Sequence, residues 1–329
     1  ERCCYHAASL FQDLLLPMRI LLAPMEGVLD APMRRLLTAI GGYDACVTEF
    51  IRVSDSALDG KALLRHCPEL AEGGTTASGT PVLLQLLGSE PQLLAQSAVA
   101  AVAAGAAAID LNFGCPSRFV NRNRGGAALL KEPQQMAAII AAVRKHVPAH
   151  LPVSAKIRLG YETPEYALDL ARAVQEAGAS FVTVHARTRE DGYRHPARWE
   201  WLGRIREAIT IPLIANGDIN SVEDYRQCRA ISGCEDVMLG RGALMQPDLA
   251  LQLRAATSSA HPHTPMRWCD IPPLFARLAQ LIPPGNRSDV RLKQWLGMMK
   301  LRHQEAERAF AQIRTLHDSD AILAALASG

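Results

Sequence analysis

The sequence lacks the long apolar segments that mark membrane proteins. No apolar run reaches the length of about 18 residues that a spanning helix requires, so we expect no membrane span. Positions 1–16 hold a short apolar patch, but Asp13 interrupts it and no small-residue cleavage site of the usual kind follows. We therefore expect the patch not to be a signal peptide, and we treat 1–17 as an N-terminal extension of unknown role.

The chain also lacks the cysteine spacings of metal sites. It has eight cysteines, but none forms a Cys-x-x-Cys pair and no Cys/His cluster has the spacing of zinc ligands. A chain of 329 residues buries a core large enough to fold without disulfides. We therefore expect no metal, a reducing cytoplasmic setting and a monomer.

Net charge is small, at +2, but it is unevenly distributed. From Arg254 onward ten Lys and Arg stand against six Asp and Glu, a net of +4, which leaves −2 for positions 1–253. A basic C-terminal part is a weak indication of a polyanionic partner. A solvated helical face explains the same charge equally well.

Eight short apolar runs recur through the first three quarters of the chain. Most are rich in Val, Ile and Leu without alternation, as strands covered on both faces are. Segments between them have helical periodicity, for example 92–104, 133–146, 165–177 and 222–231. The apolar runs lie at 19–23, 45–50, 81–86, 107–111, 152–158, 180–185, 212–215 and 235–239.

Eight strand-helix units over about 235 residues predict a (β/α)8 TIM barrel at 18–255. A doubly wound sheet is the alternative, but it needs a Gly-x-Gly-x-x-Gly turn after its first strand, and none is present there. Beyond this point the pattern is helical, at 271–281, 290–310 and 321–327. We predict an α/β protein whose barrel is followed by a small all-helical C-terminal domain at 256–329.

One cysteine is distinguished by its position. Cys115 lies in the sequence Asn-Phe-Gly-Cys-Pro, just past an apolar run and before a predicted flexible loop at 117–124 that carries arginines. TIM-barrel enzymes place their chemistry at the carboxyl ends of the strands. Most cysteines are inert small hydrophobes, but this position favours a functional thiol.

Other polar residues stand at predicted strand ends, where a barrel gathers them around one pocket. Glycine turns at 216–218 and 240–242 follow strands seven and eight, where backbone N–H groups commonly hold a phosphate; closing the loops is the alternative. Lys156 lies inside an apolar run, so it needs a partner, an anionic ligand or a barrel end to reach water. With Gln85 and His185 it would suit the polar edge of a heterocyclic cofactor.

Eight motifs, in order along the chain, resemble the tRNA-dihydrouridine synthase family. They span every predicted strand end from about position 18 to about 315. The beginning of the first motif and the segment Phe-Ile-Arg-Val at 50–53 are similar to the bacterial C type, which reduces uridine 16 in the tRNA D-loop. The motifs are Ala-Pro-Met-Glu-Gly-Val-Leu-Asp at 23–30, Thr-Glu-Phe at 48–50, Gln-Leu-Leu-Gly at 85–88, Leu-Asn-Phe-Gly-Cys-Pro-Ser at 111–117, Lys-Ile-Arg-Leu-Gly at 156–160, Val-His-Ala-Arg-Thr at 184–188, Asn-Gly-Asp-Ile at 216–219 and Gly-Arg-Gly at 240–242.

The resemblance implies FMN in the barrel mouth, NADPH as reductant and tRNA as substrate. Cys115 matches the family's catalytic cysteine. The positions that match FMN contacts are Pro24, Met25, Glu26, Gln85, Lys156, His185, Asn216, Gly217, Asp218, Gly240 and Arg241. Those that match contacts with the extruded uridine, its neighbours or the rest of the tRNA are Arg52, Asn112, Tyr193, Arg291, Lys293 and Arg314.

The implied reaction explains why a cysteine suits this position. Reduction of the uracil 5,6 double bond needs a hydride at C6, which FMN would supply, and a proton at C5, which Cys115 would supply from the opposite face of the ring. A free thiol has a pKa of about 8.5, so it is mostly protonated at neutral pH, as an acid must be.

Three other functions remain as alternatives. A small-molecule flavin oxidoreductase of the dihydroorotate dehydrogenase kind has a similar turn after strand four, but it does not need a basic helical domain. An RNA-binding module without catalysis would not need Cys115 and a flavin site. An aldolase that forms a Schiff base on Lys156 would be trapped by borohydride.

Overall fold

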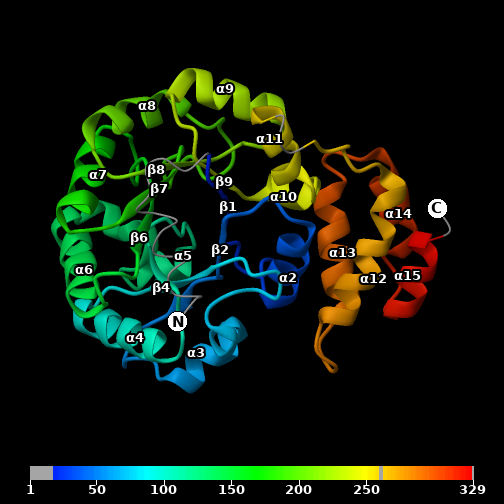
Figure 1. Cartoon of the computed structure of the whole chain (residues 1–329), viewed down its shortest axis with the longest axis horizontal. Helices are drawn as coiled ribbons and strands as arrows, with labels where there is room; N and C mark the ends of the chain where they lie inside the picture. The colour runs from blue at the N-terminus through cyan, green and yellow to red at the C-terminus, as the bar shows by residue number, and fades with distance from the viewer. Residues whose placement is uncertain (1–17, 259–261, 328–329) are drawn as a thin grey trace.

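The computed structural model describes residues 18–258 and 262–327, so the expected extension at 1–17 lies outside the described residues. Within these ranges, nine parallel strands form one sheet in the order β2-β1-β9-β8-β7-β6-β5-β4-β3. Because β2 also pairs with β4, the sheet closes into a barrel. Helices surround the barrel, and a second group of helices lies beside it (Figure 1).

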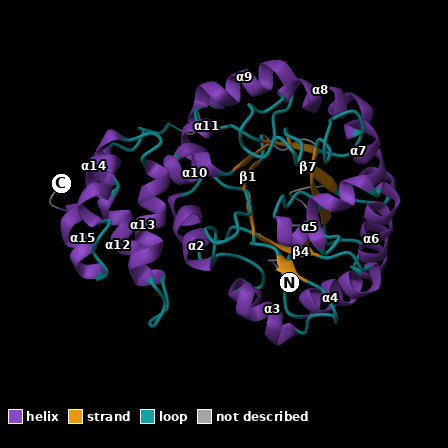
Figure 2. Cartoon of the chain, turned by 180° about the vertical axis from the view of Figure 1, so that it is seen from behind, coloured by secondary structure: helices purple, strands orange, loops and turns teal. Residues whose placement is uncertain are grey.

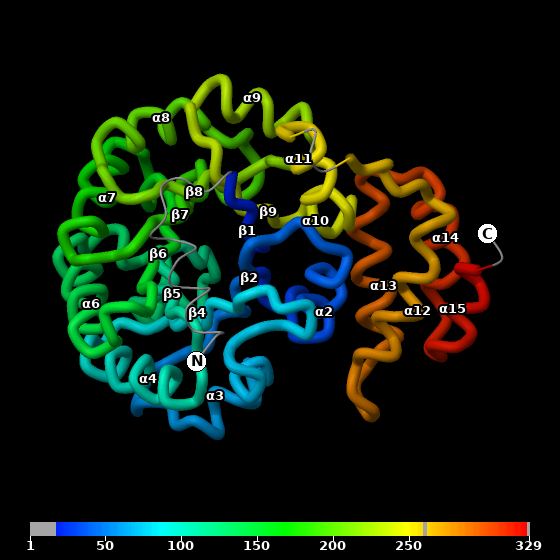
Figure 3. The backbone as a smooth tube through the Cα atoms, in the orientation of Figure 1, coloured from blue at the N-terminus to red at the C-terminus, as the bar shows by residue number. Residues whose placement is uncertain are grey.

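The strands confirm the predicted apolar runs and the barrel. The second run, 45–50, contains only β2, and β3 follows directly after its end; β2 and β3 pair with successive parts of β4 and share one position in the barrel wall. Eight strand positions therefore close the cylinder, with β1 beside β9 (Figure 3). The strands are β1 Ile20–Leu22, β2 Ala45–Val47, β3 Ile51–Arg52, β4 Val82–Leu87, β5 Ala108–Asn112, β6 Val153–Arg158, β7 Phe181–His185, β8 Leu213–Asn216 and β9 Val237–Leu239.

The outer helices begin where the sequence supplies caps. The side chains of Asp30 and Ser221 each accept a hydrogen bond from the backbone N–H three residues further on. Pro91 and Pro133 occupy the first positions of their helices, where a missing N–H costs nothing. The helices of the barrel, including α5 inside the ring of the others, are α2 Ala31–Ile40, α3 Gly60–His66, α4 Pro91–Ala103, α5 Arg118–Arg122, α6 Pro133–His146, α7 Ala167–Glu176, α8 Trp199–Ala208, α9 Val222–Ser232, α10 Arg241–Met245 and α11 Leu249–Thr257.

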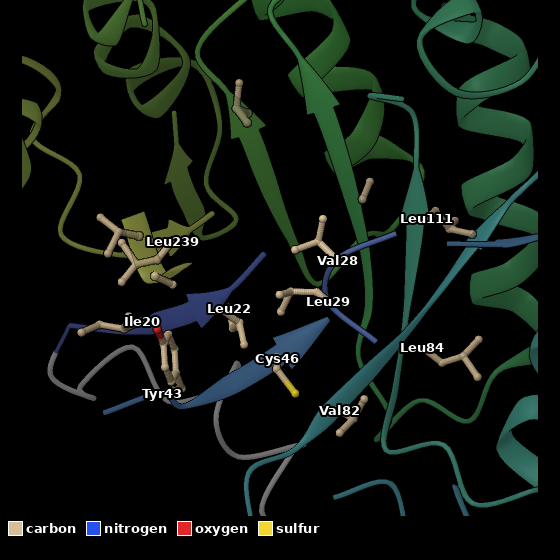
Figure 4. Close-up of a cluster of buried hydrophobic side chains, with 14 of the residues drawn as sticks. Ile20, Leu22, Val28, Leu29, Tyr43, Cys46, Val82, Leu84, Leu111 and Leu239 are labelled. Carbon is tan, nitrogen blue, oxygen red and sulfur yellow. The ribbon is translucent and has the colours of Figure 1, made fainter. Parts of the chain in front are cut away.

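Alternate residues of each strand face the two sides of the barrel wall. Ile20, Leu22 and Leu84 belong to the large apolar layer between the barrel and its helices (Figure 4). The residues between them along each strand point to the other side of the wall and form a smaller cluster. Its members come from strands around the whole barrel, so their side chains meet inside it. This inner cluster consists of Leu21, Ala23, Ala45, Val47, Leu83, Ala108, Phe181, Ile214 and Met238.

The C-terminal helices form the predicted helical domain (Figure 2). They are α12 Pro272–Leu281, α13 Ser288–Met299, α14 Gln304–Ile313 and α15 Ser319–Ala327. The prediction of one helix at 290–310 is wrong, because the helix breaks between α13 and α14. His303 has extended backbone at this break, and its ring nitrogen Nε2 lies 2.9 Å from the carbonyl oxygen of Met245 in the barrel. The break thus depends on a tertiary contact, and no glycine or proline marks it in the sequence.

Two buried contacts hold the helical domain against the barrel. Trp295 on α13 stacks on Phe275 at 4.4 Å between ring centroids and donates its indole N–H to the carbonyl of Leu244, 3.0 Å away. Asp248, which is fully buried, accepts from the backbone N–H of Met266 at 2.8 Å and bonds to His263 Nε2 at 2.7 Å. These bonds therefore tie the chain at positions 263–266, between α11 and α12, to the end of the barrel. Across the described ranges, every helix is too short or too polar to cross a bilayer.

Candidate active site

A cavity of about 460 Å³ lies at the carboxyl ends of the barrel strands. All eleven residues that match FMN contacts line this cavity, although they are spread along the sequence from Pro24 to Arg241. Cys115, Asn112 and Tyr193 line it as well. The fold thus brings to one place the residues that the sequence motifs singled out, and their role as cofactor ligands stays a prediction.

Strand register explains why these side chains meet. Residues that pair across neighbouring parallel strands share one face of the sheet, so their side chains point to the same side of the barrel. The polar residues near the strand ends are paired in this way around the barrel. The pairs are Asn112 with Lys156, Arg158 with His185, His185 with Asn216, and Asn216 with Met238.

A chain of hydrogen bonds runs from the barrel interior to the turn of Cys115. Asp110, 1% exposed, accepts from Ser154 Oγ at 2.5 Å and from Gln85 Nε2 at 2.6 Å. Gln85 Oε1 accepts from Asn112 Nδ2 at 2.7 Å, and Asn112 Oδ1 accepts from the N–H of Cys115 at 2.9 Å. An ionised carboxylate only accepts, so Asp110 sets the orientation of both amides. We call these residues the Asp110 chain.

Replacement of Asp110 by Leu tests the structural weight of this chain. The variant keeps the approximate shape but leaves the buried donors of Ser154 and Gln85 without their acceptor, at a cost of about 1–3 kcal/mol each. We expect the midpoint of urea unfolding to fall, with Asp110→Asn, which retains one acceptor oxygen, lying between Leu and the parent. Burial raises the pKa of Asp110, so the cost of burying its charge opposes the gain from its hydrogen bonds. Equal midpoints for Leu and the parent would refute the structural weight given to the chain.

Cys115 is held close against the cavity wall. It is 8% exposed and packs with Leu87 and Val120. Gly126 has φ +58°, and a Cβ there would lie 3.0 Å from the Cβ of Cys115, so glycine permits the close approach of the chain over the thiol. The prediction of a loop at 117–124 is wrong in part, because α5 occupies Arg118–Arg122.

Burial controls the protonation of the groups facing the cavity. Burial is the main cause that raises the pKa of Cys115, so the thiol stays protonated at neutral pH. Burial, reinforced by the charge of Arg158, lowers the pKa of Lys156 to about 8. Burial and the nearby cations hold the pKa of His185 well below its usual range, so the ring is neutral. Its Nε2 lies 3.3 Å from Arg187 Nη1, and since arginine only donates, Nε2 is the acceptor.

The cavity carries more positive than negative charge. Its lining includes four cations, Lys156, Arg158, Arg187 and Arg241, against the carboxylates of Glu26 and Asp218. Arg187 and Arg241 both pair with Asp218. Among the described residues, no carboxylate lies within ion-pair distance of Lys156 or Arg158; Lys156 bonds to Asn216 Oδ1 at 3.1 Å and Arg158 to the carbonyl of Gly114 at 2.7 Å. Two unneutralised cations in one cavity fit an anionic ligand.

The two glycine turns lie at the cavity, as predicted from the sequence. Gly217 has φ +119°, and a Cβ there would lie 3.0 Å from Cδ2 of His185, so the glycine lets the histidine ring pack against the turn. Asp218, with φ +55°, accepts from the backbone N–H of Ala197 at 3.0 Å in addition to its two arginines. A Cβ on Gly240 would make ordinary van der Waals contact, 3.8 Å from the Cβ of Ala23 and from Sδ of Met25.

Two of the residues expected near the uridine come from well-separated strands of the barrel: Arg52 ends β3, and Tyr193 follows β7, four strand positions away. Tyr193 is 58% exposed and lies under the guanidinium groups of Arg241 and Arg158, 4.8 and 5.7 Å from its ring centroid. Arg52 lies outside the cavity lining, over the ring of Phe119 at 4.4 Å. Their contacts with substrate stay predictions.

The three candidates in the helical domain have different surroundings. Arg314 is exposed at the end of α14. Lys293 donates to the carbonyl of Leu316 at 2.8 Å, with its side chain 15% exposed. Arg291 donates to the carbonyls of Gly27 and Val28 at 2.6 and 2.5 Å, next to the first strand of the barrel. The structure therefore places Arg291 in the contact between the helical domain and the barrel.

Removal of the Arg291 side chain should loosen this contact. Arg291→Ala removes the donor to the carbonyl of Val28, one of the two donors to the carbonyl of Gly27, which keeps Gln294 Nε2 at 2.9 Å, and the cation 3.0 Å from Asp30. We expect a loss of about 2 kcal/mol in unfolding free energy, read by urea unfolding. Arg287→Ala is the matched control, because Arg287 lies at the start of the same helix, is 70% exposed and pairs only with Asp289 among the described residues. Equal stability of the two variants would refute the role given to Arg291.

Some residues at the site were not assigned a role from the sequence. Asp110, like Lys156, is a charged residue within an apolar run, and that signal was sufficient to find it. Phe50 and Met298 also line the cavity; Phe50 lies in the motif Thr-Glu-Phe at 48–50 but was given no role, and no sequence pattern marks Met298. Met298 comes from α13, so the helical domain contributes to the cavity wall. In the described ranges, no three His, Cys, Asp or Glu side chains are grouped as metal ligands.

Solved structures with low sequence identity share the barrel fold. A 2-naphthoyl-CoA reductase in complex with 2-naphthoyl-CoA is 14% identical, with a TM-score of 0.56 over 75% of this chain and 52% of that one. A histamine dehydrogenase from Rhizobium sp. 4-9 is 12% identical, with a TM-score of 0.55 over 80% of this chain and 49% of that one. At these identities the likeness concerns the fold alone.

Sequence comparison gives a much closer relationship. A tRNA-dihydrouridine(16) synthase from Pseudomonas putida is 48% identical over 304 residues, which are 92% of this chain and 94% of that protein. One from Neisseria meningitidis serogroup A is 46% identical over 92% of each chain. The family model described as dihydrouridine synthase (Dus) matches residues 21–320. The chain therefore belongs to the dihydrouridine synthase family.

Proposed function

We propose that this chain reduces uridine to 5,6-dihydrouridine in the D-loop of tRNA, at position 16, with bound FMN and with NADPH as reductant. Its family and the names of its relatives support dihydrouridine formation in tRNA. The observation that carries the proposal is the single cavity lined by Cys115 and by all residues that match FMN contacts.

The residues present fit FMN. Lys156 and Arg158 leave positive charge unneutralised in the cavity, which suits the electron-rich edge of a flavin ring. Gln85 keeps a second N–H on Nε2 beyond the one given to Asp110, and the glycine turns with Arg241 suit the phosphate end. When bound and reduced by NADPH, FMN supplies the hydride for C6 of uracil.

Cys115 serves as the general acid in this proposal. Its raised pKa keeps the proton on sulfur, and Asn112 fixes the turn that carries it. The thiol gives this proton to C5, on the face of uracil opposite to the hydride, and the thiolate formed takes up a proton from solvent in the next cycle. Within the Asp110 chain, Asp110 and Ser154 act only through their neighbours, by holding Gln85 and through it Asn112, which orients the turn of Cys115.

The target uridine has to leave the folded tRNA to reach the cavity, and loop bases that are already unpaired are extruded most easily. Tyr193 offers an exposed ring at the opening. The helical segment 287–314 carries seven Lys and Arg against three acidic residues. We expect phosphate contacts there, so tRNA affinity should fall steeply with salt.

Two measurements test this function. Purified protein should show the absorption bands of a bound flavin and oxidise NADPH in the presence of unmodified tRNA. Mapping of dihydrouridine in tRNA from cells that lack the protein should show its loss at position 16. Loss at another position would overturn only the choice of uridine, whereas an unchanged dihydrouridine content would overturn the function.

A Schiff-base aldolase is a second candidate, since a lowered lysine pKa is what such chemistry needs. The pKa of about 8 for Lys156 is the observation in its favour. Borohydride treatment with carbonyl substrates should leave the protein mass unchanged if the flavin function is correct. A small-molecule oxidoreductase of the dihydroorotate dehydrogenase kind would instead turn over free pyrimidines without RNA.

A further inference from the structure

Phe119 is a large apolar side chain left open to solvent next to the cavity. It is 64% exposed, and its ring has no polar group that would gain from water. It lies on α5, which sits inside the ring of outer helices in both views of the chain (Figures 1 and 2). A single exposed apolar side chain is ordinary, so its meaning depends on the residues around it.

The backbone places Phe119 directly outside the cavity wall. Pro116 and Ser117, just before α5, line the cavity, and Phe119 follows them. Its neighbour Val120 is buried against Cys115 and Leu87 and anchors α5 over the thiol. The exposed ring therefore has a fixed position relative to the reacting group.

Arg52 completes this surface from a different strand. It ends β3, two residues after Phe50, which lines the cavity. The guanidinium carbon of Arg52 lies 4.4 Å from the centroid of the Phe119 ring, so one face of the ring carries a cation. We call Arg52 and Phe119 together the ledge.

The surroundings of the ledge are basic. Arg118 and Arg122 are exposed and lie four residues apart, on one face of α5. Neither has an ion pair within the described part of the chain, whereas Arg124 pairs with Glu132. An aromatic ring, a stacked guanidinium and unpaired arginines are the combination that holds single-stranded nucleic acid.

We propose that the ledge stacks the base of a nucleotide adjacent to the uridine that enters the cavity. This inference rests on the proposed function and adds to it a second base-binding position. Extrusion of one base leaves its neighbours without stacking partners, and aromatic and guanidinium planes replace that stacking. In this arrangement Tyr193 contacts the RNA strand on one side of the opening, and the ledge contacts the RNA strand on the other side.

The test compares tRNA binding and turnover in Phe119 variants of the holoprotein. Phe119→Ala should weaken binding of an unmodified tRNA transcript, and raise its KM, by roughly tenfold. Phe119→Trp should retain wild-type binding, because it preserves a stacking surface. Tyr166→Ala is the matched control: Tyr166 is equally exposed, at 64%, but stands at the start of α7 in the outer ring of helices (Figure 1). Melting temperature and NADPH oxidation without tRNA should be the same in all variants.

A transcript with an abasic site next to the target uridine identifies the stacked base. Loss of that base should weaken binding to the parent protein but not to Phe119→Ala, because both changes remove the same contact. The proposal would be overturned if the losses in binding from Phe119→Ala and from the abasic site were additive whichever neighbour of the uridine lacked its base. It would also be overturned if Phe119→Ala bound tRNA like the parent. Dihydrouridine formation by the parent protein tests the proposed function separately, so the two failures are distinguishable.

Discussion

Cys115→Ala protein is expected to reduce uridine in tRNA about 10²- to 10⁴-fold more slowly than the parent, the range that a positioned general acid contributes. Reduction of the bound flavin by NADPH should proceed at the parental rate, since it needs no proton from this thiol. The two half-reactions are measured separately, by anaerobic stopped flow without tRNA and by single-turnover product analysis with tRNA.

Two variants control this experiment. Cys269→Ala removes an exposed thiol outside the cavity lining and should change neither half-reaction. Cys115→Ser retains a hydroxyl donor of much weaker acidity and should fall between Ala and the parent. If Cys115→Ala formed dihydrouridine at the parental rate, another group would have to be the acid.

The assignment of Cys115 as general acid also predicts how the rate of uridine reduction depends on pH. Because burial raises the pKa of Cys115, the thiol keeps its proton through neutral pH and loses it only above the ordinary thiol range. The rate of uridine reduction should therefore be level near neutrality and fall on the alkaline side. That alkaline fall should be absent from the residual rate of Cys115→Ala.

Lys156→Met protein is expected to bind FMN roughly 10- to 100-fold more weakly than the parent at pH 7, because it loses a hydrogen bond from a charged donor. The measurement is a titration of cofactor-free protein followed by flavin fluorescence. Lys145→Met, which changes an exposed lysine in the last turn of α6, should bind FMN as the parent does.

The direction of the pH effect follows from the lowered pKa. Below about pH 8 Lys156 is already charged, so binding of an anionic ligand needs no proton uptake. Above that value the lysine must gain a proton to bind the anion, and the affinity should fall by up to tenfold per pH unit. Lys156→Met should show no such fall between pH 7 and 9, and an equal pH dependence in both proteins would remove Lys156 from the cofactor site.

The stability of cofactor-free protein should vary with pH in the opposite direction. Unfolding restores the lysine to its ordinary pKa of 10.5, so between about pH 8 and 10.5 the unfolded chain binds more protons than the folded one. The contribution of Lys156 to unfolding free energy therefore rises with pH across this window. Burial of Lys156 thus lowers the stability of the cofactor-free protein below about pH 10.5, whereas its charge favours binding of the anionic cofactor.

Much of the fold was predictable because barrel strands and their helices are local patterns. The apolar runs needed to be covered on both faces, and residues such as Asp30, Pro133 and Ser221 supplied helix starts where the structure has them. The break between α13 and α14 was not predictable, since it depends on the contact of His303 with Met245 across the domain boundary.

The candidate site also has features that the sequence predicts and features that only the tertiary structure shows. By itself, the sequence determined the order of the strand ends and the residue types placed there; together with the family resemblance, these selected Cys115 and the candidate cofactor positions. The tertiary structure decided which side chains share one face of the closed sheet, which cations find a carboxylate, and that Arg291 holds the two domains together. The physical reason is that the order of residues sets local backbone conformation, whereas burial and charge pairing arise only when segments distant in the sequence come into contact.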